Sequence, residues 1–427
     1  MPIRFSPEQV NRYTFYKQFL TPEAKGADPL AVVKAVGPLR ATPPTTPYLS
    51  LWARMRRFSC QQLEEAMYQD RSLVRIPCMH AKLYIVPVED LAAYYQVSKP
   101  LLSHVLESLG SLLNDAAVSW LDGQSFTVRE LVQRVLEVMS TRGPCTIDEL
   151  AKLLPELNAR VFHDPEHPEE GYSRLGTRLI PAMCAQGLLV RARPRGGWRS
   201  DLYTYVTLSS WLPQVKLAEM PFEEALRRVV ARYVAAFGPV TIGDISHWFG
   251  GLARRQIASA LMALRGQLVR VQIAGSQGDY YMLKEQVAEL LDGVPEGDPS
   301  VCLLPPRDSY PMAYSSSERF LPHPYQDRVF DRVGEAAGTV WWDGTVIGTW
   351  SLQFKEERIA VRFFDKVDPD VLALVGEEAQ RLGDFLNFSE LDIELGHYPE
   401  PTTSEDEGLL AILPYIDPQV QPSDGVR

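Results

Sequence analysis

Cysteine is scarce in this chain of 427 residues. The five cysteines are odd in number, form no C-x-x-C pair and lie far apart, at Cys60, Cys78, Cys145, Cys184 and Cys302. A disulfide framework or a zinc scaffold needs cysteines paired at characteristic spacings, so this pattern argues against both. It favours a reducing compartment.

Long apolar runs and the common enzyme motifs are also missing. No stretch approaches the ~20 uncharged apolar residues of a membrane helix, and Met1–Phe5 lacks the pattern of a signal peptide. The sequence has no dinucleotide-binding glycine motif, phosphate-binding loop, zinc-protease motif or serine-hydrolase elbow. His163 and His167 have a metal-like spacing, but two prolines and no cysteine accompany them. We therefore expect no cofactor, no metal and no membrane partner.

Charge is unevenly distributed along the chain, whose formal net charge is −11. Residues 388–427 hold nine Asp and Glu against one Arg, whereas residues 1–57 carry nine Lys and Arg against three acids. The window Arg174–Arg199 has six arginines and no acid. Two basic clusters in an acidic chain indicate an anionic partner.

An internal repeat organises the middle of the chain. The segment Gly143–Leu150 (GPCTIDEL) matches Gly238–Ile245 (GPVTIGDI), and each follows an expected apolar helix. The threonine of each copy is placed to cap a short helix with an acid in its first turn. A further helix is expected next, and then a hairpin that begins with Leu189-Val190-Arg191 or Leu268-Val269-Arg270. Three helices and a hairpin are the winged-helix order.

A weaker third copy opens the chain. Helices expected around Pro7–Phe19, Pro29–Ala35 and Pro47–Met55 precede Leu73-Val74-Arg75, which enters a hairpin of Leu73–Met79 and Lys82–Val86. The triplet Leu-Val-Arg thus stands at three expected hairpin entrances. An acidic, Pro-rich stretch in the middle copy, around residues 163–170, is expected to be a surface loop.

The C-terminal part is predicted to be a small barrel-like sheet with one helix, Asp370–Leu386, packed on it. Asp343-Gly344 between alternating apolar runs is typical of a type I′ hairpin. The expected strands are Val301–Leu304, Thr339–Asp343, Thr345–Gln353 and Ile359–Phe364. The acidic residues beyond this sheet are expected to be mobile or loosely docked, because they include few aromatics.

The predicted fold class is α+β, with three tandem winged-helix domains followed by a small C-terminal β-barrel-like domain. The predicted boundaries are winged helix 1 over residues 1–122, winged helix 2 over 123–214, winged helix 3 over 215–292, the β-barrel-like domain over 300–387 and an acidic tail over 388–427.

Several strings resemble the AlkZ/YcaQ-type winged-helix DNA glycosylase family. They are Tyr48–Arg54 (YLSLWAR), Arg71–Arg75 (RSLVR), Leu83–Asp90 (LYIVPVED), Leu303–Asp308 (LLPPRD) and Val340–Trp350. The resemblance runs in the family's order over roughly residues 5–385. It implies three tandem winged helices and a small β-barrel wrapped around duplex DNA.

The resemblance also implies where the catalytic residues belong, and there the chain departs from the family. Its glycosylases carry a Gln-x-Gln motif that holds the water attacking C1′ of an N-alkylated nucleotide; Arg40-Ala41-Thr42 occupies that position here. Arg40 has only donors and a fixed positive charge, so it accepts no proton and repels a cationic lesion. Lys82 and Tyr84 replace the Thr and His expected in the hairpin. Arg40 and Thr42 remain the candidate catalytic positions.

The candidate DNA ligands are basic residues at hairpins and helix ends, where winged helices meet phosphates. They are Arg54, Arg56, Arg57, His80, Lys82, Arg174, Arg178, Arg191, Arg193, Arg195, Arg199, Arg254 and Arg255.

Three functions remain open at this point. The first is a duplex-DNA-binding protein that recognises lesions or structure in DNA repair without the standard hydrolytic site. The second is an active DNA glycosylase, a hydrolase of N-glycosyl bonds acting on alkylated or crosslinked purines through a changed site. The third is a tandem winged-helix scaffold that binds proteins. The expected partner is double-stranded DNA, and the expected location is the cytoplasm, in association with the nucleoid.

Overall fold

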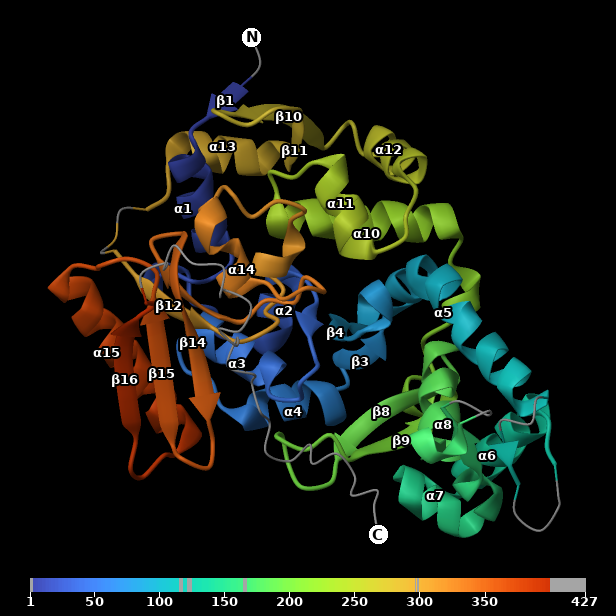
Figure 1. Cartoon of the computed structure of the whole chain (residues 1–427). Helices are drawn as coiled ribbons and strands as arrows, with labels where there is room; N and C mark the ends of the chain where they lie inside the picture. Colours follow the sequence, from blue (N-terminus) through green and yellow to red (C-terminus); the bar gives the residue numbers. More distant parts are fainter. Residues whose placement is uncertain are drawn as a thin grey trace. The chain divides into compact units, whose positions relative to one another are not determined.

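The computed structural model describes residues 3–114, 118–120, 125–163, 167–295, 297 and 299–399. The chain forms two compact units. The first combines the N-terminal residues up to Leu63 with the chain from Val230 onward, and the second is Glu64–Val229. Figure 1 shows the elements of both.

The first unit begins with a short strand and helices that have strong N-terminal caps. Ser6 and Gln9 form a capping box before α1, and the Asp28 carboxylate accepts the Ala31 N–H at 2.7 Å at the start of α2. The elements are β1 (Ile3–Phe5), α1 (Pro7–Lys17), α2 (Pro29–Val36), β2 (Leu39–Arg40), α3 (Thr46–Arg54) and α4 (Cys60–Tyr68), which crosses the boundary between the units.

A second group of elements in the first unit follows the predicted repeat. Thr241 caps α11 in a capping box with Asp244, as its sequence predicts. Val240 bridges Tyr281 of the hairpin, and β1 pairs in parallel with β10 at the other edge of the sheet, as Figure 1 shows. The elements are α10 (Phe222–Phe237), which crosses the boundary between the units, α11 (Ile242–Phe249), α12 (Arg254–Ala263), β10 (Leu268–Ile273), β11 (Tyr280–Leu283) and α13 (Lys284–Asp292).

The C-terminal part of the first unit is a five-stranded sheet covered by one helix (Figure 1). The strand order in the described residues runs from β12 to β16 without closure, so the expected barrel is wrong and the sheet is open. The elements are β12 (Val301–Leu304), α14 (Gln326–Val329), β13 (Gly338–Trp342), β14 (Thr345–Gln353), β15 (Arg358–Phe363), α15 (Pro369–Leu386) and β16 (Asp392–His397).

The predicted hairpin at Asp343-Gly344 is confirmed. Both residues have positive φ, 44° and 87°, as a type I′ turn requires. A Cβ on Gly344 would lie 2.9 Å from the Asn11 carbonyl oxygen, so α1 excludes a side chain there. Glycine is needed for the close approach as well as for the turn.

The second unit contains two hairpins and a long helix. Thr146 caps α7 in a capping box with Glu149, as predicted. The elements are β3 (Leu73–Pro77), β4 (Leu83–Pro87), α5 (Leu91–Asn114), β5 (Val118–Ser119), α6 (Val128–Arg142), α7 (Ile147–Leu153), β6 (Arg160–Phe162), β7 (Tyr172–Arg174), α8 (Leu175–Ala185), β8 (Leu189–Pro194), β9 (Tyr203–Thr207) and α9 (Leu208–Trp211).

The sequence of elements thus repeats three times as helix, helix, helix and hairpin. We call these sets copy 1 (α2, α3, α4, β3, β4), copy 2 (α6, α7, α8, β8, β9) and copy 3 (α10, α11, α12, β10, β11). Copies 2 and 3 agree with the prediction. In copy 1 the third helix is α4, which the sequence analysis missed, whereas α1 lies outside the repeat.

One other expectation agrees with the structure, and one needs correction. The stretch around 163–170 connects β6 and β7, which pair with each other, and its described residues His163, His167, Glu169 and Glu170 are exposed, as expected of a surface loop; residues 164–166 lie outside the described residues. The acidic tail predicted to begin at 388 instead begins with β16, which pairs in parallel with β15. Residues 400–427 lie outside the described residues.

Glycine 37 reveals a repeat signal that the motif search missed. Gly37-Pro38-Leu39-Arg40 corresponds to Gly143-Pro144-Cys145-Thr146 and to Gly238-Pro239-Val240-Thr241. Arg40 therefore stands where the other two copies have their capping threonine. Because arginine does not cap a helix N-terminus, the second helix of copy 1 starts only at Thr46.

We predict that removing β16 destabilises the protein. A chain that ends at Asn387 loses the ladder between β15 and β16, the hydrogen bond of Tyr398 to Thr349 and the Leu391 side chain that packs on Gly383. We expect the free energy of unfolding to fall by at least about 2 kcal/mol, measured by urea denaturation. The matched control is a chain that ends at Pro399, and equal stability of the two chains would contradict the role of β16.

Candidate functional site

A short segment after β12 holds α3 and β2 in place. In this segment, Pro305–Ser309, the Pro306 carbonyl oxygen accepts a hydrogen bond from the Thr46 hydroxyl at 3.2 Å. The Ser309 hydroxyl donates to the Pro38 carbonyl oxygen at 2.6 Å and accepts the Arg40 N–H at 3.2 Å. The 305–309 segment therefore fixes the strand that carries the candidate catalytic position.

The strongest contact of this segment is a buried ion pair. Both guanidinium nitrogens of Arg54 donate to the Asp308 carboxylate, at 2.8 and 2.7 Å, and the Ser50 hydroxyl donates to it at 2.6 Å. The side chains of Arg54 and Asp308 are 1% and 0% exposed. Arg54, which the sequence predicts to contact DNA, thus has an enclosed guanidinium that is bound to a carboxylate.

The surroundings of this pair are dry and cationic. Lys25 donates to the Ala53 carbonyl oxygen, and burial lowers the pKa of its ammonium group. Burial raises the pKa of the Cys302 thiol to about 12, so this cysteine has no nucleophilic thiolate at neutral pH. Arg381 of α15 lies 3.8 Å from the ring centre of Trp52. These groups pack around α3.

The side chain of Arg40 is enclosed and forms a second ion pair. Its guanidinium donates to the Glu335 carboxylate at 2.5 Å, and Arg307 binds the same carboxylate. The side chain of Arg40 is 4% exposed and that of Glu335 14%. The charge of Arg40 is thus partly neutralised inside the protein. Its sequence position implies repulsion between Arg40 and a cationic lesion, and this pairing removes much of that repulsion. It offers a water molecule no accepting atom.

The other residues of the candidate site differ in their exposure. Thr42 is half-buried in the turn after β2. In the second unit, Tyr84 is buried, whereas His80 and Lys82 are exposed at the tip of the β3–β4 hairpin. His80 has φ 52°, a left-handed conformation that suits a tight hairpin tip.

The predicted basic cluster of copy 2 is largely paired with carboxylates. Arg174 lies 2.7 Å from Asp148 and Arg195 lies 3.2 Å from Glu149, while Arg193 pairs with Glu64 and Arg178 donates to the Ser173 hydroxyl at 2.6 Å. These carboxylates come from outside the 174–199 window, so local composition did not reveal them. Exposed pairs contribute about 0–1 kcal/mol, and phosphates compete with them readily.

Arg191 is a different case. It is 9% exposed, and its guanidinium lies over the rings of Tyr203 and Tyr205, at 5.9 and 5.6 Å. Arg191, predicted as a phosphate ligand, is thus enclosed and packs within the hairpin. Arg199 is half-buried and lies over the ring of Trp198 at 5.0 Å.

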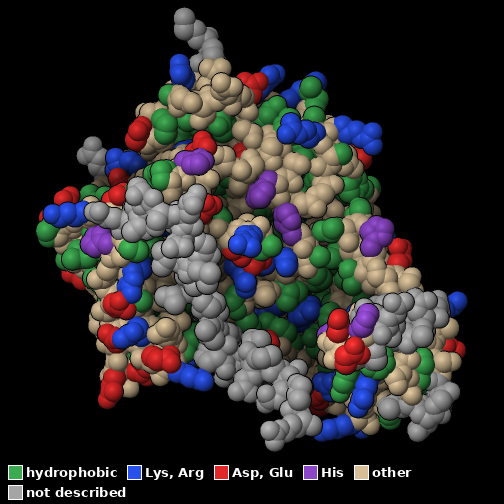
Figure 2. All heavy atoms as spheres, viewed as in Figure 1, with side chains coloured by type: hydrophobic (Ala, Val, Ile, Leu, Met, Phe, Trp, Pro, Cys, Tyr) green, Lys and Arg blue, Asp and Glu red, His purple; other side chains and the backbone are tan. Residues whose placement is uncertain are grey.

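Among the exposed predicted ligands, four are arginines outside copy 2: Arg56, Arg57, Arg254 and Arg255. None of the four forms an ion pair with a carboxylate of the described residues. Arg254 and Arg255 begin α12, where the helix N-terminus adds positive potential. Figure 2 shows Lys and Arg side chains in several separate groups on the viewed face, with Asp and Glu among them.

Glu335 is not among the residues that the sequence predicts for the site. The string Leu303–Asp308, which carries part of the resemblance, has both of its charged residues in ion pairs: Arg307 binds Glu335 and Asp308 binds Arg54. In the sequence, the adjacent opposite charges of Arg307 and Asp308 were the signal that could have indicated buried ion pairs. Nothing in the sequence around Glu335 indicates its partner.

Two further features concern metal binding and membrane-spanning helices. In the part of the chain that the structure describes, no group of three or more His, Cys, Asp or Glu side chains is arranged to hold a metal ion. None of the helices in the described ranges has the length and apolar character of a membrane span.

Comparisons with known proteins agree with this architecture. The model of the family described as "DNA glycosylase AlkZ-like" matches residues 33–385. The chain therefore belongs to the AlkZ-like DNA glycosylase family. Among solved structures, the Streptomyces sahachiroi DNA glycosylase AlkZ is similar in fold, with a TM-score of 0.69 and 20% sequence identity; the match covers 92% of this chain and 100% of that one. No curated protein sequence matches the chain.

We predict that the pair of Arg54 and Asp308 is essential for stability. Replacing Asp308→Asn leaves the buried guanidinium without its counter-charge, so the free energy of unfolding should fall by about 3–5 kcal/mol. Urea denaturation followed by tryptophan fluorescence measures this. Arg358→Gln, which breaks an exposed pair with Asp392, is the control and should cost less than about 1 kcal/mol. Equal losses in the two variants would refute the role of the buried pair.

Proposed function

We propose that this chain is a duplex-DNA-binding member of the AlkZ-like family, active in lesion or structure recognition during DNA repair, in which a closed ion pair replaces the hydrolytic residues. The observation that carries this proposal is the environment of Arg40, which is 4% exposed and bound to Glu335. We further propose that copies 1, 2 and 3 are three tandem winged helices.

The support for DNA binding is the position of the exposed arginines. Winged helices contact duplex DNA through the third helix and the hairpin. Arg254 and Arg255 begin the third helix of copy 3, and Arg193 and Arg195 lie at the hairpin of copy 2. His80 and Lys82 are at the hairpin tip of copy 1. Such positions suit phosphates rather than base edges, so we propose binding with little sequence preference.

The argument against standard hydrolysis is chemical. Holding an attacking water requires an accepting atom within about 3 Å and room for the water. Arg40 offers only donors, and both of its neighbours in the ion-pair cluster, Glu335 and Arg307, are engaged with each other. A carboxylate bound by two guanidinium groups is a poor base, because their charges stabilise its ionised form.

A second candidate function is an active DNA glycosylase with a changed site. Membership of a family described as DNA glycosylases favours it. Thr42 keeps a partly exposed hydroxyl at the third position of the motif, where it is able to position a water molecule. A cationic lesion is already a good leaving group, so modest positioning suffices for slow excision.

We predict that binding to duplex DNA depends steeply on salt. If about five of the exposed basic residues each neutralise a phosphate, log K should fall against log salt with a slope near −4.5. Gel shifts or fluorescence anisotropy at increasing salt measure the slope. The double substitution of Arg254→Gln and Arg255→Gln should make the slope shallower by about 2. The substitution Arg358→Gln should leave the slope unchanged. A wild-type slope shallower than about −2 would favour the protein-binding scaffold.

We also predict that a designed pair restores excision. Changing Arg40→Gln together with Thr42→Gln removes the enclosed cation and supplies two amides that hold water. Each contact to the water is worth roughly a few kcal/mol in the transition state, so release of N7-alkylated guanine should rise by orders of magnitude. Alkaline cleavage of the abasic product measures release, and retained DNA affinity shows that the variant is folded. Efficient excision by the wild type, with no gain in the variant, would establish the second candidate instead.

A further inference from the structure

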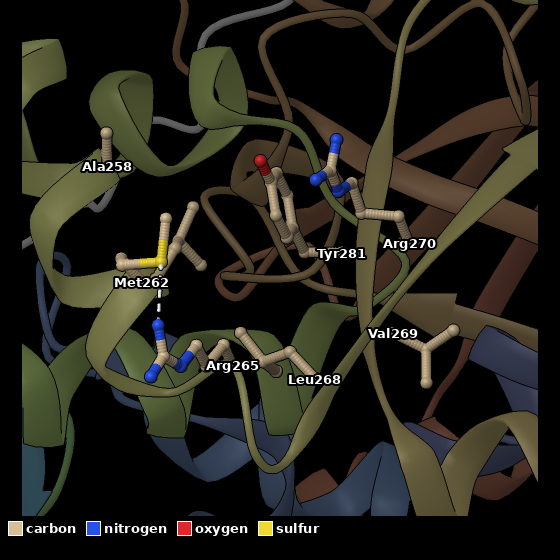
Figure 3. Close-up of a pocket in the computed structure, with 8 residues that line it drawn as sticks. Ala258, Met262, Arg265, Leu268, Val269, Arg270 and Tyr281 are labelled. Atoms are coloured by element: carbon tan, nitrogen blue, oxygen red, sulfur yellow. Dashed lines mark hydrogen bonds between the residues drawn. The ribbon is translucent and has the colours of Figure 1, made fainter.

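A groove lies between α12 and the hairpin of copy 3, with a cavity volume of about 360 Å³. Figure 3 shows Met262 of α12 and Tyr281 of β11 across it from each other. Leu268 and Val269 contribute apolar surface, and Arg265 and Arg270 flank it. Arg265 contacts only the Met262 sulfur, at 3.9 Å, while Arg270 pairs with the exposed Asp279 at 3.1 Å.

The corresponding surface of copy 2 is covered by the protein itself. Leu189-Val190-Arg191 corresponds to Leu268-Val269-Arg270, and the strand registers match, because Arg191 lies opposite Tyr205 as Arg270 lies opposite Tyr281. In copy 2 the strand β3 packs against both α8 and β8. The Arg75 guanidinium of β3 lies over the ring of Tyr203 at 4.7 Å.

Two pairs of equivalent residues differ in their exposure between copy 2 and copy 3. Met183 of α8 is 0% exposed, whereas Met262, at the equivalent position before the shared glycine (Gly187 or Gly266), is 62% exposed. Arg191 is 9% exposed, and the side chain of Arg270 is 69% exposed. The equivalent surface is thus covered in copy 2, where α8 packs on α5 as well as on β3, and uncovered in copy 3.

We propose that residues 405–416 of this chain, EDEGLLAILPYI, occupy the copy 3 groove. This tail segment combines three consecutive acids with aliphatic residues, which complements two arginines beside an apolar floor. The match to the family model ends at residue 385. The proposed occupant of the groove therefore lies outside the part of the chain that the family model covers. Ten Cα-to-Cα steps lead from Pro399 to Leu409 and span at most about 35 Å, comparable to the diameter of a small domain.

The arrangement is an interaction of a chain with itself, in which the tail covers the surface that β3 covers in copy 2. Tethering gives such a segment an effective concentration near the millimolar range, so weak contacts suffice for occupancy. Aliphatic side chains enter beside Met262 and Leu268, and the carboxylates of Glu405–Glu407 meet Arg265 and Arg270.

Amide hydrogen exchange of the full chain, read by mass spectrometry, tests the proposal. In the wild type, amides of residues 405–416 should exchange at least about fivefold more slowly than the rate of an unstructured peptide. Met262→Asp and Arg270→Glu should each return them to that rate. The matched controls are Leu291→Asp, at an apolar residue that is 63% exposed on α13, and Lys284→Glu; both should keep the protection.

Three results would overturn the proposal. The first is exchange of the wild-type tail segment at the unstructured rate. The second is protection that persists in Met262→Asp and Arg270→Glu while exchange elsewhere in copy 3 is unchanged. The third is protection that disappears on dilution, which would assign the groove to the tail of a second copy. The readout is independent of DNA binding and of excision.

Discussion

The buried pair of Arg54 and Asp308 holds together elements that lie far apart in the sequence. Arg54 ends α3 and Asp308 follows β12, and both side chains are almost completely enclosed. An ion pair in such a place is stable only with its hydrogen bonds complete, and Ser50 and the Tyr310 N–H complete those of Asp308. Two of the strings that mark the family, YLSLWAR and LLPPRD, meet at this contact, which explains why both carry charged residues.

The same segment decides what the candidate site is able to do. Ser309 fixes the backbone of Arg40, and Arg307 shares Glu335 with its guanidinium. The charged group of Arg40, the candidate catalytic position, is therefore part of the support of the fold. In copies 2 and 3 the equivalent residue is a threonine that caps a helix. Copy 1 lacks that cap, and Arg40, at the same position, pairs with Glu335 of the C-terminal part instead.

The triplet Leu-Val-Arg shows how one sequence pattern acquires different roles. Arg75 and Arg191 are buried against tyrosine rings where β3 packs on β8, whereas Arg270 remains exposed beside a groove. The triplet begins the first strand of a hairpin in each copy, because alternation and the turn act locally. The exposure of the arginine depends on which distant segment covers the hairpin.

The sequence alone determined the elements whose signals are local. Caps at Thr146 and Thr241, the Asp343-Gly344 turn, helix α10 and strands β10 and β14 all have the predicted positions, because caps, turns and periodicity act within a few residues. Only the tertiary structure decided the fates of Arg54, Arg191 and Arg40 and the inclusion of β16 in the sheet. Their partners are Asp308, Tyr203, Glu335 and β15. Burial and pairing of a charge depend on residues brought together by folding, which composition and spacing do not reveal.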